Sequence, residues 1–144
     1  MSHGSVDLID MADTFQLEIV TPEKMVVRDT AEEMQIPGKN GYLGILPGHA
    51  PLITELAVGE ITYRNGNTIE HLSVAWGFAE VLPDKVTILA ETAERADEVD
   101  VNRAEAAKQR AETNLANCHT EDDFKRVGSD LKRAETRLEV AEKK

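Results

Sequence analysis

Apolar and polar residues alternate along much of residues 15–90, which is the pattern of strands that bury one face. Phe15, Leu17 and Ile19 are separated by single polar residues, and Pro22 then ends the run. Short apolar pieces bounded by Pro, Gly and Asp follow in the same segment. This spacing favours a β-sandwich over helices.

Two turn signals divide the later part of this segment. Asn65-Gly66 lies between the apolar runs 61–63 and 68–72, and the positive φ angles that Asn-Gly adopts readily predict a tight hairpin. Pro83-Asp84 separates the runs 72–81 and 86–89 in the same way. Residues 14–90 are therefore predicted to form an all-β domain.

After Glu91 the apolar period changes from two residues to about 3.6. A first helix is predicted over about 101–117, with Asp97 or Asp100 as its N-terminal cap. Thr120 followed by Asp123 resembles a capping box and predicts the start of a second helix. The apolar stripe of this helix is Phe124, Val127, Leu131, Ala134, Leu138 and Ala141.

The chain is thus predicted to have two parts, an α+β arrangement in which the sandwich is followed by a linker over 91–99 and an α-helical hairpin over 100–144. The predicted seam, that is the contact between the two helices, contains small residues such as Ala104, Ala111 and Ala134. Each of them buries little apolar area, so the seam is expected to contribute little stability. We therefore expect the hairpin to undock readily. A permanently paired hairpin is the alternative.

Charge supports the same division and excludes one class of function. Residues 1–89 carry 5 basic and 13 acidic side chains, whereas residues 90–144 carry 11 and 14. The net charge of −11 argues against binding to nucleic acid.

No apolar run reaches the roughly 18 residues that cross a bilayer, so no membrane insertion is expected. The single Cys118 is typical of a reducing compartment, and residues 1–13 are expected to be a flexible extension.

Motifs of independent catalysis are missing from the sequence. It contains no G-x-x-x-x-G-K-[ST] phosphate loop, no H-E-x-x-H and no G-x-S-x-G, and its four histidines lack ligand spacing. We therefore expect no catalytic residue, no metal site and no required cofactor.

The segment 37–54 carries a family resemblance. It reads PGKNGYLGILPGHAPLIT and closely resembles the G-x-x-G-x-x-G-x-x-P-G-H-A-P-L-x-T signature of the epsilon subunit of bacterial F-type ATP synthases. The resemblance extends over residues 14–143 and implies a ten-stranded β-sandwich followed by a helical hairpin. The sequence departs from the pattern at Trp76, where the family frequently has glycine, and at Tyr42, where some members have an acidic residue.

The resemblance implies a non-catalytic rotor subunit of the central stalk. Its sandwich would bind the gamma subunit and rest on the c-ring through Gly41, Tyr42, Leu43 and His49. Its helices would inhibit ATP hydrolysis when extended toward the catalytic alpha/beta head, and permit rotation when folded down. Such a chain lies peripherally at the cytoplasmic face of the cell membrane, as part of the proton-translocating complex.

A second resemblance lies in the tail and implies ATP as a regulatory ligand. Val99-Asp100-Val101-Asn102-Arg103-Ala104 is similar to the [IL]-D-x-x-R-A motif with which some members bind ATP. The residues that match the nucleotide contacts of those members are Glu94, Asp100, Arg103, Arg110, Arg133 and Arg137. Two arginines seven apart on one helix and two that are four apart on the other would converge on a phosphate chain. The alternative is a solvated face with intrahelical pairs such as Asp100 with Arg103.

Three functions from different classes remain open at this point. The first is a stalk and regulatory subunit, the second a free-standing ATP-sensing module, and the third an enzyme without a recognisable motif. The resemblance favours the first.

Overall fold

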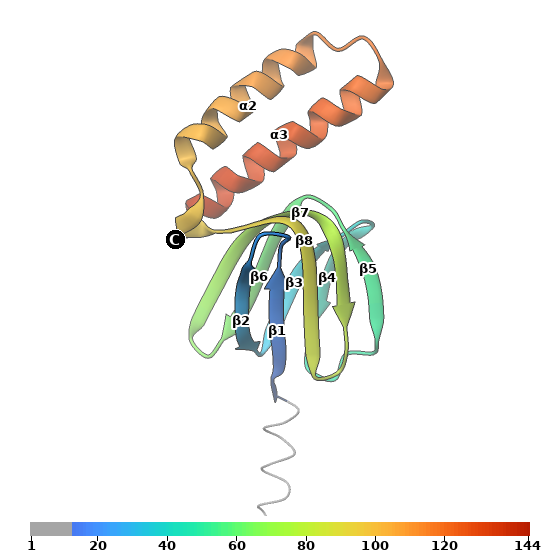
Figure 1. Cartoon of the computed structure of the whole chain (residues 1–144), viewed down its shortest axis with the longest axis vertical. Coiled ribbons are helices and arrows are strands. Elements are labelled where there is room, and N and C mark those ends of the chain that lie inside the picture. The colour runs from blue at the N-terminus through green and yellow to red at the C-terminus, as the bar shows by residue number, and fades with distance from the viewer. Residues whose placement is uncertain (1–12) are drawn as a thin grey trace, which may run out of the picture.

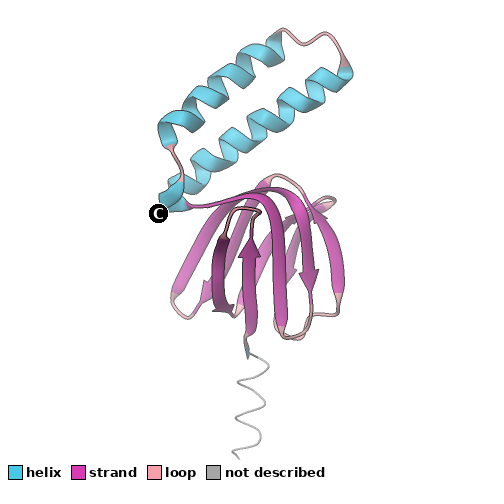
Figure 2. Cartoon of the chain, viewed as in Figure 1, coloured by secondary structure: helices cyan, strands magenta, loops and turns pink. Residues whose placement is uncertain are grey.

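The computed structural model describes residues 13–144, so the extension expected over residues 1–13 lies almost entirely outside the described residues. Eight strands come first, and a 3₁₀ turn and two helices follow (Figures 1 and 2). The strands are β1 (Phe15–Val20), β2 (Met25–Ala31), β3 (Glu33–Gly38), β4 (Gly41–Ile45), β5 (Leu52–Leu56), β6 (Gly59–Asn65), β7 (Thr68–Val81) and β8 (Lys85–Arg95). They are followed by η1 (Ala96–Glu98), α2 (Val101–Ala116) and α3 (Glu121–Ala141).

One continuous sheet folds over itself to make the sandwich, with strand order β2-β1-β8-β7-β5-β3-β4 and β6 joining β3 to β7. β1 pairs with β8 in parallel, and the other described pairings are antiparallel. The core between the two layers contains Leu17, Ile19, Ile61, Leu72 and Ile88, all fully buried. The sandwich and the hairpin predicted from the sequence are confirmed.

The structure has eight strands where the resemblance implied ten. The 14-residue strand β7 accounts for part of the difference, because it serves both layers: residues 68–74 pair with β6, and residues 77–81 pair with β5. The strand region also runs to Arg95, past the expected boundary at residue 90. Its last residues, Thr92–Arg95, pair with Leu72–Ala75, and this long-range pairing keeps the chain extended.

The break between the two halves of β7 lies at Trp76. Ala75 pairs with Thr92 and Gly77 with Ala90, so Trp76 and Glu91 form no pair between them, while the register of β7 and β8 continues unchanged on both sides. Trp76 has φ 51°, in the left-handed region that glycine adopts without steric cost. Trp76 is thus the one non-glycine residue with positive φ in the part of the chain that the structure describes.

The helices begin and pair as their caps and stripes predict. The Asp100 carboxylate accepts a hydrogen bond from the Arg103 N–H at 3.1 Å, and the Thr120 hydroxyl accepts one from the Asp123 N–H at 3.1 Å. The seam buries the small residues expected, Ala104, Ala111 and Ala134. Phe124 is the exception among the predicted stripe, since it is 57% exposed.

The hairpin lies over one end of the sandwich, with α3 nearer to the strands and the C-terminus beside η1 (Figure 1). α3 contacts β6, β7, β8 and η1. Neither described helix is apolar enough over a sufficient length to cross a membrane.

Candidate functional site

α2 and α3 enclose a polar pocket of about 200 Å³ between them. Arg110 of α2 faces Arg133 and Arg137 of α3 across this space. The remaining lining residues are Ala107, Ala111, Asn114, Asp130 and Ala134. Because alanine side chains fill little volume, they leave the space that the arginines surround. Three guanidiniums, set against the Asp130 carboxylate in the lining and the Glu94 carboxylate that pairs with Arg137, leave the pocket an excess of one positive charge, which suits a phosphate chain.

The other three residues of the predicted nucleotide set, Glu94, Asp100 and Arg103, are not in the lining of this pocket. Glu94, near the end of β8, accepts a hydrogen bond from Arg137 Nε. Asp100 caps α2 through the backbone of Arg103, whose own side chain is exposed. The structure therefore brings Arg110, Arg133 and Arg137 together, links Glu94 to them, and leaves Arg103 outside.

Two basic side chains of α3 and one just beyond its end hold the hairpin on the sandwich. The Arg133 guanidinium carbon lies 5.2 Å from the centroid of the Trp76 ring, and Arg137 pairs with Glu94. Beyond the end of α3, Lys143 Nζ donates to Glu60 Oε1 of β6 at 2.7 Å. Two side chains of α3 outside the predicted stripe, Thr136 and Val140, are also buried. Docking thus combines a small apolar contact with several charged ones.

Among the residues of these contacts, Glu60 has the most side-chain hydrogen-bond partners. Its other carboxylate oxygen is 2.6 Å from His71 Nδ1, and the Thr62 hydroxyl donates to the same oxygen at 3.3 Å. Burial alone would raise the pKa of Glu60, but the hydrogen bonds from Lys143 and His71, together with their charges, hold the pKa below its ordinary value. The carboxylate is therefore stabilised in its charged form.

We expect this contribution to docking to disappear in acid. Because the folded-state pKa of Glu60 is lowered, the stabilisation is complete above its ordinary pKa of 4.5 and is lost as the pH falls through the lower folded value. Glu60→Gln should cost about 1 kcal/mol of unfolding free energy at pH 7. Urea unfolding at pH 7 and pH 3 should show the difference from wild type shrinking in acid. Glu139→Gln, at an exposed carboxylate of α3, is the control, and a Glu60→Gln effect equal at both pH values would contradict this expectation.

The segment 37–54 contains the edge strand β4 and the connection from it to β5. Gly41, with φ 131°, starts β4, and Tyr42 is 55% exposed there. The Tyr42 hydroxyl accepts a hydrogen bond from the Glu60 backbone N–H at 3.0 Å. Leu43 points the other way and packs against the core, because successive side chains of a strand alternate between its faces. His49 lies beyond the other end of β4, so it is separated from Tyr42 by the length of the strand.

An apolar patch lies on the outer face of β5, β7 and β8. Phe78 is paired across the strands with Leu89, and Ile53 lies on β5 beside them. The three side chains are 52%, 55% and 70% exposed. We call these three residues the outer patch. Clustered exposed apolar side chains on a sheet are typical of a protein contact surface.

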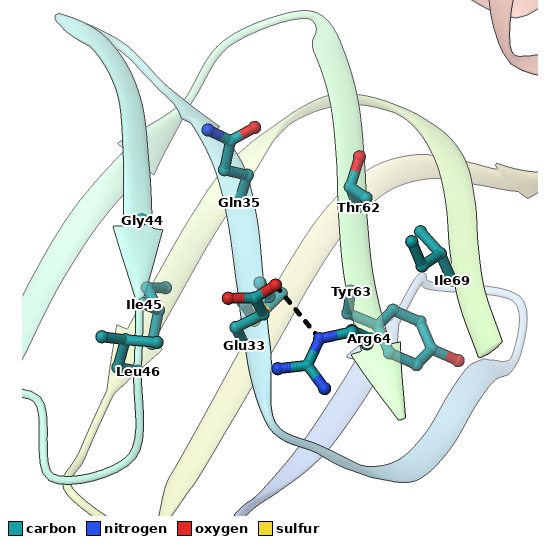
Figure 3. Close-up of a pocket in the computed structure, with 10 residues that line it drawn as sticks. Glu33, Gln35, Gly44, Ile45, Leu46, Thr62, Tyr63, Arg64 and Ile69 are labelled. Atoms are coloured by element: carbon teal, nitrogen blue, oxygen red, sulfur yellow. Dashed lines mark hydrogen bonds and ion pairs between the residues drawn. The ribbon is translucent and has the colours of Figure 1, made fainter. Parts of the chain in front are cut away.

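A second hollow, of about 380 Å³, lies over β3, β4 and β6 (Figure 3). The Arg64 guanidinium crosses it toward Glu33, at 3.2 Å, and also pairs with Glu32 at 2.6 Å. These carboxylates neutralise Arg64, while Ile45, Leu46 and Ile69 supply apolar surface. This hollow therefore lacks the unbalanced positive charge of the arginine pocket.

Sequence patterns did not predict several of these features. The contact between Glu60 and Lys143 joins residues that are 83 positions apart, and neither belongs to a motif. Asp130, which lines the arginine pocket, is also not part of a sequence motif. The outer patch did have a signal, because Phe78 and Leu89 are apolar residues at outward positions of antiparallel strands, where polar residues are usual.

Comparisons with known proteins cover both parts of the chain. Residues 14–96 match the family model described as ATP synthase, Delta/Epsilon chain, beta-sandwich domain, and residues 97–142 match the long alpha-helix domain of the same chain. The ATP synthase epsilon chain of Koribacter versatilis is 71% identical over 105 residues, which are 73% of this chain and 74% of the relative. That of Syntrophobacter fumaroxidans is 49% identical over 92% of this chain and 99% of its own length.

Solved structures share the fold at low sequence identity. A chain of the Euglena gracilis mitochondrial ATP synthase, in a structure of OSCP, F1 and the c-ring, has a TM-score of 0.75 at 21% identity, covering 90% of this chain and 81% of that one. A chain of the Tetrahymena thermophila enzyme has a TM-score of 0.63 at 13% identity, over 88% and 96% of the two chains. With both domains matched and relatives at this identity, the chain belongs to the family of F-type ATP synthase epsilon subunits.

Proposed function

We propose that this epsilon subunit works in the central stalk, where it passes rotation of the c-ring through gamma to the catalytic head without doing chemistry itself. The outer patch carries the proposal: Ile53, Phe78 and Leu89 give a closed, well-packed sandwich an apolar surface on which a partner would be held. The Tetrahymena structure that shares the fold is described as central stalk and c-ring, which supports the same place in the assembly.

The proposed partner at the outer patch is the gamma subunit. The c-ring would meet the exposed strand edge at Gly41 and Tyr42, with His49 contributing from the opposite end of β4. As part of this complex, the chain is proposed to lie peripherally at the cytoplasmic face of the membrane.

Co-expression with the gamma subunit of the same organism tests the stalk role. We expect a stable binary complex on size-exclusion chromatography and no ATP turnover by the isolated chain. Failure to bind gamma, with ATP still bound, would favour the free-standing sensor. Turnover that survives further purification and scales with the amount of chain would favour an enzyme.

The tail is proposed to regulate hydrolysis by moving between two positions. The docked hairpin described above would be the permissive form, and helices extended toward the alpha/beta head would inhibit. The small contact area of Ala104, Ala111 and Ala134, together with charged contacts to the sandwich that are only partly buried, supports a modest docking free energy. A modest free energy is what allows a ligand to change the balance.

ATP is proposed to be that ligand, bound by its phosphates between α2 and α3. The pocket of about 200 Å³ is below the roughly 300–1,000 Å³ of pockets that enclose a whole small molecule, so it fits a phosphate chain with the nucleoside outside. Binding only to the paired helices stabilises them by RT ln(1 + [L]/Kd), about 2.7 kcal/mol at a hundredfold excess over Kd. ATP is therefore expected to favour the compact form.

Arg110→Ala tests the pocket most cleanly, because the sandwich contacts described above use Arg133 and Arg137. Losing one charged hydrogen bond to phosphate should weaken ATP binding by about tenfold. Isothermal titration calorimetry of the isolated chain measures this.

Lys132→Ala is the matched control for Arg110→Ala, since it removes one exposed positive charge of α3 outside the pocket lining. We expect its ATP affinity to stay within about twofold of wild type, because an exposed charge contributes little. Equal losses in both variants would show unspecific charge attraction, and no binding by the wild type would rule out the nucleotide site.

A further inference from the structure

We propose that Trp76 is a positioning residue for the arginine pocket: its ring holds the Arg133 guanidinium, and so ties α3 to the sandwich while presenting Arg133 to a bound phosphate chain. The nucleotide part of this inference rests on the proposed ATP site. The contact between the ring and the guanidinium stands independently of it.

The backbone at Trp76 is the first observation. A bulky aromatic residue stands at φ 51°, where the left-handed conformation is costly for every residue except glycine. Such a conformation persists only where the surroundings determine it, here the β8 pairs of Ala75 and Gly77 on either side and the hydrogen bond from the Trp76 N–H to the Ala57 carbonyl oxygen at 3.3 Å. With this backbone, the Trp76 side chain contacts Arg133 of α3.

The position of Arg133 is the second observation. Its guanidinium carbon lies 5.2 Å from the centroid of the Trp76 ring, and the same residue lines the pocket with Arg110 and Arg137. Its ion pair with Asp130 is long, at 3.8 Å, and lies within one helix. The ring is therefore the contact that joins Arg133 to the sandwich.

The two roles of Arg133 are compatible because they use different properties of the group. An aromatic face attracts the positive charge of a guanidinium and consumes none of its five N–H donors. Arg137 differs, since its Nε–H is already donated to Glu94. Of the two α3 arginines that line the pocket, Arg133 is thus the one whose donors the sandwich contact leaves available.

Loss of the ring should return rotamer freedom to Arg133. Immobilising one long side chain on binding corresponds to about a two- to tenfold change in affinity. We therefore expect Trp76→Leu to weaken ATP binding by this factor. Trp76→Phe should restore most of the loss, because it keeps an aromatic face. Both variants place a non-glycine residue at the same left-handed position, so the backbone cost cancels in the comparison.

Double-mutant cycles separate positioning from a general loss of structure. By calorimetry, Trp76→Leu should have no further effect on ATP affinity once Arg133→Ala is present, and should be additive with Arg110→Ala. A full additional loss in the Arg133→Ala background would overturn the positioning role. Equal affinities of the Leu variant and the wild type would overturn it as well.

A measurement without nucleotide tests the contact itself. Trp76 is the single tryptophan of the chain, so intrinsic fluorescence reports on its ring alone. Arg133→Ala should increase quenching by acrylamide and shift the emission to longer wavelength, whereas the control Lys132→Ala should not. Unchanged fluorescence in Arg133→Ala would overturn the contact. Absence of ATP binding by the wild type would instead overturn the proposed nucleotide site, and the fluorescence would still decide the contact.

Discussion

Gly77→Ala is expected to destabilise the sandwich by about 3–5 kcal/mol, a large part of the stability of a domain of this size. A Cβ at this position would lie 1.9 Å from the Leu89 carbonyl oxygen and 2.9 Å from Ala90 Cα. Both atoms belong to the backbone of β8, which cannot move aside as a flexible side chain would. The φ of 125° adds strain for any residue with a Cβ.

The control is Gly44→Ala on β4, where an added Cβ meets nothing within 4 Å. We expect a change within about 0.5 kcal/mol there. Urea unfolding followed by circular dichroism compares the two variants. A loss below 1 kcal/mol in Gly77→Ala would mean that β7 and β8 are free to rearrange around Gly77, and the placement of Trp76 beneath Arg133 would then lose its structural basis.

Local rules predicted most of the elements. The Asn65-Gly66 turn, the alternation of Phe15, Leu17 and Ile19, and the Thr120 cap each depend on a few neighbouring residues, and each is confirmed. The alanine-rich contact between the two helices was predicted from helical periodicity alone. These features need no knowledge of distant parts of the chain.

The parts that sequence patterns did not supply depend on pairing between distant segments. The extension of β8 to Arg95 is set by β7, and the count of eight strands by the way β7 serves both layers. In the site, periodicity placed Arg133 and Arg137 on one helix, but it held no information on Trp76 or Glu94 as their partners. The resemblance marked Trp76 as unusual without indicating what its ring contacts.

Phe78→Asp is expected to weaken binding of gamma by about 2–4 kcal/mol, roughly 30- to 1,000-fold in Kd. Phe78 is the aromatic member of the outer patch and lies between Glu55 and Leu89 in the cross-strand register. Aromatic residues at the centre of an interface carry much of its binding free energy. An aspartate there would also bring an unpaired charge into the interface, next to Glu55.

The fold should survive this substitution, because Phe78 is 52% exposed and lies outside the core. Ile69→Asp is the matched control: it places the same charge on the same strand at a residue that is 54% exposed, away from the outer patch. Surface plasmon resonance with immobilised gamma measures both variants, with thermal unfolding to verify their folding. If both folded variants bind as tightly as the wild type, gamma does not occupy the outer patch. If both lose affinity equally, the loss reflects the added negative charge of the chain and not the apolar contact at Phe78.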